Sequence, residues 1–152
     1  MDESVNESLS LTIMDAFGIA PKDVHTYSPL VLAFIGDDVF DLIIRTILVE
    51  KANQPVNMLH KKASAIVKAS SQKAIYKAIE DMLSEEEKSV YRRGRNAKSN
   101  TMAKNASVGE YRSATGFEAM IGYLYLTGQM RRILELVRLG LERTKQRDQA
   151  EE

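Results

Sequence analysis

Residues 30–48 read LVLAFIGDDVFDLIIRTIL, and apolar side chains would point in nearly every direction around a helix formed by this run. The pattern predicts a helix in the centre of the core. Its few charges share one stripe. With Asp37 as the origin, Asp41 falls at about 40°, Arg45 at about 80° and Asp38 at about 100° around the axis. A charged stripe on a helix otherwise suited to burial is a candidate functional site.

Two explanations of this stripe remain open. Asp41 and Arg45 are four residues apart, which is the spacing of an ion pair within one helix, and we favour that explanation for these two residues. It does not account for Asp37. That residue follows Gly36, which weakens a helix but permits close approach of a backbone or a ligand.

The rest of the chain also shows helical spacing of apolar residues, with little period-two alternation, and so predicts an all-α fold. Ser84 and Glu87 have the spacing of a capping box at a helix start. We expect helices over residues 9–17, 29–50, 58–69, 71–83, 84–93, 110–126 (starting at 110 or 113) and 129–147, and a polar loop over residues 94–109. The 152 residues contain no Cys, which excludes disulfides and Cys-ligated zinc.

A second candidate site residue is Glu118, the only charged residue between Arg112 and Arg131. A carboxylate in such an apolar segment is costly unless it is paired, protonated or bound to a metal. An ion pair with Arg45 or Arg112 and a metal site are equally compatible with the sequence. Two acids on two core helices favour oxygen ligands for Mg²⁺ in phosphodiester hydrolysis. Zinc-ligand spacing and a Gly-rich phosphate loop with a Lys are absent from the sequence.

The formal net charge is zero, but the charges are segregated along the chain. Residues 51–109 contain twelve Lys or Arg against five Asp or Glu, whereas the remainder contains nine against sixteen. This predicts a basic face suited to nucleic acid. The lysines of residues 61–77, taken alone, also fit ordinary solvated helices. We expect RNA contacts from Arg92, Arg93, Arg95 and Lys98 in the segment RRGRNAK, and we consider Lys61, Lys62 and Lys104 as further candidates.

Two motifs resemble a known family. AFIGDDVFDL, residues 33–42, resembles the signature helix of the ribonuclease III family, and ATGFEAMIGYLYL, residues 114–126, resembles its second catalytic helix. Together with RRGRNAK they are similar to the mini-ribonuclease III branch, whose catalytic domain lacks an attached double-stranded-RNA-binding domain. The resemblance covers residues 27–141 and leaves a charged tail, residues 142–152. It implies one catalytic domain over residues 1–152, folded as the helical bundle of a ribonuclease III endonuclease domain.

The resemblance also implies an activity and a site. Asp37 and Glu118 would be the catalytic carboxylates and Mg²⁺ ligands of an endoribonuclease that cleaves double-stranded RNA, with ribosomal RNA precursor as a substrate. The working form would be a homodimer with one site in each subunit. Asp41 is a candidate water-mediated ligand, and Asp38 would lie beside the metal ligands. Larger ribonucleases III have three further acids, at positions that are here Leu30, Ala33 and Thr115.

Two other functions compete with this one. The missing acids favour a catalytically inactive relative that binds structured RNA, whereas the retained Asp37 and Glu118 favour the enzyme. A helical protein-interaction domain would leave residues 92–98 unexplained. The acidic start of the chain lacks the features of a secretory signal, and residues 113–130 are too polar for a membrane span, so we expect a cytoplasmic protein without a membrane partner.

Overall fold

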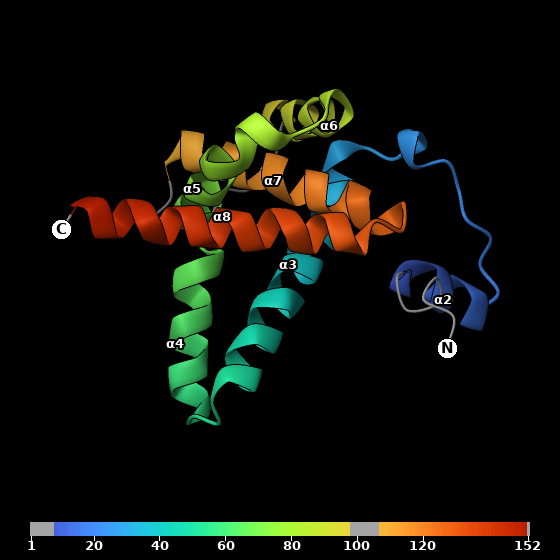
Figure 1. Cartoon of the computed structure of the whole chain (residues 1–152). Helices are drawn as coiled ribbons and strands as arrows, with labels where there is room; N and C mark the ends of the chain where they lie inside the picture. Colours follow the sequence, from blue (N-terminus) through green and yellow to red (C-terminus); the bar gives the residue numbers. More distant parts are fainter. Residues whose placement is uncertain (1–7, 98–106, 152) are drawn as a thin grey trace.

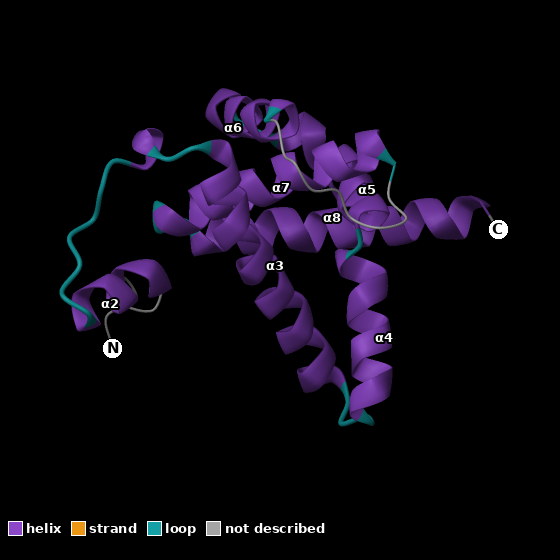
Figure 2. Cartoon of the chain, turned by 180° about the vertical axis from the view of Figure 1, so that it is seen from behind, coloured by secondary structure: helices purple, strands orange, loops and turns teal. Residues whose placement is uncertain are grey.

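The computed structural model describes residues 8–97 and 107–151, which form seven α-helices and two short 3₁₀ helices (Figures 1 and 2). These residues contain no strand, which confirms the predicted all-α fold. None of their helices is both long enough and apolar enough to cross a membrane.

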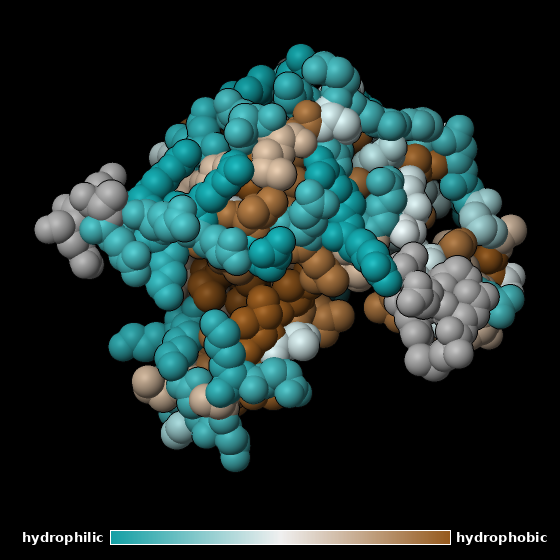
Figure 3. Space-filling view, in the orientation of Figure 1, coloured by the Kyte–Doolittle hydropathy of each residue, from teal (hydrophilic) through white to brown (hydrophobic). Residues whose placement is uncertain are grey.

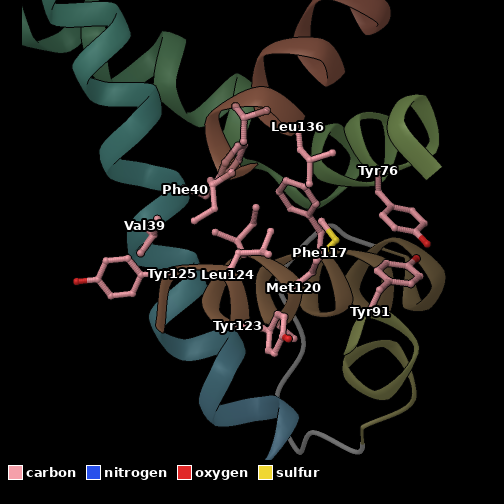
Figure 4. Packing of buried hydrophobic residues seen from close by; sticks show 14 of the residues in the cluster. Val39, Phe40, Tyr76, Tyr91, Phe117, Met120, Tyr123, Leu124, Tyr125 and Leu136 are labelled. Atoms are coloured by element: carbon pink, nitrogen blue, oxygen red, sulfur yellow. The ribbon is translucent and has the colours of Figure 1, made fainter. Parts of the chain in front are cut away.

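Helix α7 (Val108–Leu126) lies at the centre of the bundle. It packs against α3 (Pro29–Lys51), α5 (Ala69–Ile79), α6 (Glu85–Asn96) and α8 (Met130–Glu151). Every residue from Ser113 to Tyr125 is buried except Glu118, which is half-buried. The rings of Phe40 and Phe117 meet edge to face at 5.2 Å between centroids, in the core shown in Figure 4. The predicted central helix α3 thus shares the core with a second helix, α7, which is buried over more of its length.

Helices α3 and α4 (Val56–Val67) form an arm that projects below α8 in Figure 1. The chain turns between them over residues 52–55, within the gap that the sequence leaves between the expected helices at residues 29–50 and 58–69. Lys68 ends α4 and also precedes α5, with an extended ψ of 157°. The break between these two helices therefore lies about two residues earlier than predicted.

The remaining elements flank this bundle. Helix α2 (Leu9–Ala16) is tied to the end of α7 by Ser10, whose hydroxyl donates to the Tyr125 carbonyl at 3.0 Å. A 3₁₀ turn, η1 (Val24–Thr26), leads into α3, and another, η2 (Glu80–Met82), extends α5. Helix α8 continues through Glu151, so the charged tail is helical over its described part.

Serine side chains define the starts of three helices. The Ser28 hydroxyl accepts from the Val31 N–H at the start of α3, where Pro29 occupies the first turn. Ser84 and Glu87 form the predicted capping box of α6. Ser107 and Glu110 form another, which was not predicted and which starts α7 at Val108 instead of at residue 110 or 113.

Helix α6 corrects one prediction. The sequence predicts a helix to about residue 93 and then a loop, but α6 continues through Asn96. Gly94 does not break the helix because it is a packing contact: an added Cβ would lie 2.8 Å from the Ala119 Cβ of α7. Arg92, Arg93 and Arg95, which we name the α6 arginines, therefore all lie on a helix, and the assignment of Arg95 to a loop was wrong. Lys98 and Lys104 lie outside the described residues.

Candidate active site

Helices α3 and α7 cross with their backbones in contact, and two glycines permit this. A Cβ added to Gly36 would lie 1.7 Å from the Glu118 carbonyl oxygen, and one added to Gly122 would lie 2.0 Å from the Leu32 carbonyl oxygen. Any larger residue at either position would force the helices apart. The crossing therefore brings the residue after Gly36 to the residue one turn before Gly122.

Those two residues are Asp37 and Glu118. Asp37 is exposed and Glu118 is half-buried. Burial, followed by a hydrogen bond and charge repulsion from Asp37, raises the pKa of Glu118 from 4.5 to about 8, although a hydrogen bond from Gln72 opposes the shift. Glu118 therefore holds a proton around neutral pH when no cation lies beside it, and this proton lies in its hydrogen bond with Asp37. The structure brings together the two acids that the sequence singled out.

Gln72 of α5 is the neighbour of this pair that the sequence did not reveal. It is 3% exposed, and its Nε2 donates to the Val67 carbonyl at 2.8 Å and to Glu118 Oε2 at 3.4 Å. A glutamine in a lysine-rich segment carries no local signal of burial, because its burial depends on the distant helix α7. The pattern of residues 61–77 alone could not have identified it.

Two of the four charged residues in the stripe on α3 form the ion pair that their spacing predicts. Arg45 Nε lies 3.1 Å from Asp41 Oδ2, so the predicted ion pair within the helix is confirmed. No such pair is present for Glu118: within residues 8–97 and 107–151, none of the ion pairs includes it. Arg45 instead pairs with Asp41, and Arg112 is exposed. Asp38 is exposed next to Asp37.

The donor set can be tested for its fit to Mg²⁺. Two carboxylates that repel each other, with no compensating basic side chain at Glu118 in the described part of the chain, are suitable ligands for a hard divalent ion. The described residues contain no group of three or more Asp, Glu, His or Cys side chains that could hold a metal. Thr115 donates its hydroxyl to the Tyr111 carbonyl at 3.0 Å and does not extend the set. The residues therefore fit a magnesium site with two protein carboxylates.

The basic candidates lie on two surfaces. Arg92 and Arg95 line a hollow of about 480 Å³ between α5 and α6, together with Lys77 and Lys88 but also with Glu80 and Asp81. The Arg95 guanidinium lies 5.8 Å from the ring centroid of Tyr91, which stacks on Tyr76 (Figure 4). Arg93 is exposed but does not line this hollow. Lys61 and Lys62 are exposed on α4, where Lys62 donates to Gln54.

Comparison with known proteins places this geometry in a family. Residues 30–129 match the ribonuclease III domain family. The chain is 52% identical to "Mini-ribonuclease 3" of Thermoanaerobacter sp. (strain X514) over 124 residues, which span 82% of this chain and 87% of that protein. It is 47% identical to "Mini-ribonuclease 3" of Clostridium tetani over 131 residues, which span 86% and 87% of the two chains.

A solved structure agrees with these relatives. The crystal structure of protein FN1578 from Fusobacterium nucleatum superposes with a TM-score of 0.72 at 36% identity, covering 80% of this chain and 97% of that one. The motifs at residues 33–42 and 114–126, which carry Asp37 and Glu118, both lie within the matched domain. This chain belongs to the ribonuclease III family and, within it, to the mini-ribonuclease III branch.

Proposed function

We propose that this chain is a Mg²⁺-dependent endoribonuclease that cleaves double-stranded RNA, with Asp37 and Glu118 as catalytic carboxylates and metal ligands. One observation carries the proposal. Two acids 81 positions apart meet where α3 and α7 touch, with no basic partner for Glu118 in the described structure. When bound, Mg²⁺ supplies a Lewis acid for phosphodiester hydrolysis. The names of the relatives support ribonuclease activity.

The two carboxylates have different roles in this proposal. Asp37 is exposed, so an RNA phosphate can approach it, whereas Glu118 is anchored in the core and fixes the inner side of the site. Glu118 must be deprotonated to bind a cation, and the positive charge of the cation offsets both the burial and the repulsion from Asp37 that raise the pKa of Glu118. We retain Asp41 as a candidate water-mediated ligand, although it is paired with Arg45.

The basic surfaces provide a way to hold duplex RNA. Its deep major groove exposes little readable base edge, so the natural targets are phosphates, 2′-hydroxyls and A-form shape. We propose the α6 arginines as the main contacts, presented by a rigid helix beside the core. Lys61 and Lys62 on α4 are further candidates, as are Lys98 and Lys104.

Apolar surface supports a homodimer. Phe34 is 81% exposed on α3, one turn before Asp37. A groove of about 420 Å³ between α3, α4, α5 and α8 is lined largely by aliphatic side chains, and Figure 3 shows the apolar surface below α8. An interface that buries Phe34 would place two sites near a two-fold axis. Because each subunit has one pair of catalytic acids, such a dimer could cut both strands of a duplex.

The resemblance to the mini-ribonuclease III branch supports ribosomal RNA precursor as the natural substrate and the cytoplasm as the location. It also supports one catalytic domain over residues 1–152. These parts of the proposal rest on that resemblance and on the sequence.

The alternative is an inactive module of the same fold that binds structured RNA, favoured by the absence of acids at Leu30, Ala33 and Thr115. Purified protein incubated with long duplex RNA, with and without Mg²⁺, separates the two. We expect cleavage only with Mg²⁺, and none from the Asp37→Asn or Glu118→Gln variant. Binding without cleavage by the wild type would support the inactive module. Cleavage by either variant at the wild-type rate would refute the site.

A further inference from the structure

Gln72 connects the corner between α4 and α5 to the acid pair. Its backbone N–H donates to the Lys68 carbonyl at 3.0 Å, in the first turn of α5. Its side-chain Nε2 donates to the Val67 carbonyl at 2.8 Å and, on the other side, to Glu118 Oε2 at 3.4 Å. One amide group therefore links a helix end to a proposed metal ligand.

This arrangement is costly for stability. Gln72 is 3% exposed, and its Oε1 is buried with no hydrogen-bond partner among the described residues. A buried polar atom without a hydrogen-bond partner lowers stability, and an apolar side chain of similar size would avoid that cost. Capping the Val67 carbonyl does not by itself explain a buried glutamine at this position, because carbonyl groups at a helix end can accept hydrogen bonds from other side chains or from water.

The position of the amide has a specific consequence for Glu118. Its side chain has three rotatable bonds, and the nearby Asp37 carboxylate repels it when both are charged. Among the described residues, no basic side chain holds it from another direction. An N–H donor on the side of α5 counteracts the repulsion and restricts the orientation of the carboxylate.

We infer that Gln72 is a positioning residue, whose amide holds the Glu118 carboxylate in the orientation in which Glu118 and Asp37 face one divalent cation. This inference rests on the proposed function of the site. Gln72 acts through Glu118 and is not assigned contact with the RNA or with the reacting phosphate.

The adjacent residue provides a matched control. The Ser71 hydroxyl donates to the Ala65 carbonyl at 2.6 Å, so Ser71 also stabilises the α4–α5 corner, but it makes no contact with Glu118. If Gln72 were important only for the corner, Gln72→Met and Ser71→Ala would have similar effects. If Gln72 positions Glu118, only Gln72→Met should affect the metal response and the chemical step.

The test compares these two variants with the wild type. Thermal unfolding is followed over a Mg²⁺ titration, and cleavage of duplex RNA is measured for kcat and KM. For Gln72→Met we expect the Mg²⁺ concentration for half-maximal stabilisation to rise at least fivefold. We also expect kcat to fall at least tenfold, with KM within twofold of wild type. Ser71→Ala should stay within twofold in all three quantities.

Gln72→Asn provides a second variant should Gln72→Met fail to fold, since it remains polar but is one methylene too short to bridge both partners. A wild-type metal response and kcat in either variant would overturn the inference, as would equal losses in Ser71→Ala. The proposed function and the role of Gln72 can fail separately. Cleavage by the wild type, loss of cleavage in Glu118→Gln and unchanged cleavage in Gln72→Met would together refute the role of Gln72 alone. A wild type with neither Mg²⁺ stabilisation nor cleavage removes the proposed function and this inference together.

Discussion

Replacing Glu118 with glutamine tests the shared-proton state of the acid pair. The pKa of Glu118 is raised in the folded chain from 4.5 to about 8, mainly by burial and then by Asp37. Between these two pH values the folded state binds a proton that the unfolded state has lost. The stability of the wild type therefore falls as pH rises through this window, whereas the amide of the Glu118→Gln variant does not titrate.

The expected magnitude follows from the pKa. Moving it from 4.5 to about 8 corresponds to a limit of about 5 kcal/mol. Glu118 is only half-buried and Asp37 is exposed, so solvent screens much of this energy and we expect about 2 kcal/mol. In EDTA, the free energy of unfolding of Glu118→Gln minus that of the wild type should thus increase by about 2 kcal/mol from pH 5 to pH 8.

Urea denaturation at pH 5, 6, 7 and 8 measures this difference, and other titrating groups largely cancel because the proteins differ at one residue. Magnesium should reduce this difference at pH 8. At ten times its Kd it would stabilise the wild type by about 1.4 kcal/mol and the variant by much less. A difference that is independent of pH would show that Glu118 titrates normally, and the shared-proton argument would then be refuted.

Three further predictions concern RNA contact, the helix crossing and the dimer. Changing the α6 arginines together to Ala should weaken the binding of duplex RNA of any sequence. The slope of log binding constant against log salt concentration should become less steep by about one unit for each phosphate that is no longer neutralised. An unchanged slope in filter-binding assays would show that the RNA binds another surface. Gly36→Ala should destabilise the protein by about 3 kcal/mol or more in urea denaturation, because the added Cβ would overlap the Glu118 backbone. Gly109→Ala should be tolerated, since a Cβ there would approach only the Lys73 ammonium, at 4.0 Å. Equal stability of the two variants would contradict the tight crossing of α3 and α7. Dimers with one Asp37→Asn subunit should nick a duplex in one strand on native and denaturing gels, and two-strand breaks at the wild-type rate would argue against paired sites.

The sequence predicts the fold class well because α3 and α7 are identified by their own composition. It identifies both candidate site acids for the same reason, since acids in an otherwise apolar helix, three in residues 30–48 and Glu118 in the apolar part of α7, are a local signal. Their contact is not local, because it depends on how α3 and α7 cross. Gly36 indicated a close approach, but the sequence could not identify the Glu118 backbone as its partner.

Two of the differences between prediction and structure have related causes. Residues 94–96 were assigned to a loop because Gly94 and its polar neighbours resemble a helix break. The buried side formed by Val90, Tyr91 and Gly94 only becomes evident when α7 is in place. Gln72 was missed for the same reason, since its burial is imposed by a partner 46 residues away. In both cases a long-range contact with α7 overrides the local pattern.

The small number of acids at this site has an energetic consequence of its own. Larger ribonucleases III have acids at three positions that are here Leu30, Ala33 and Thr115. A site with more carboxylates would need more protons or cations to balance their repulsion. Among the described residues, Asp37 and Glu118 are the two acids that this site brings together, and one proton on Glu118 relieves most of their charge repulsion. The small number of carboxylates also lowers the affinity for Mg²⁺, because fewer negative charges face the ion. The orientation of each remaining carboxylate therefore matters more, and this is where the amide of Gln72 has its effect.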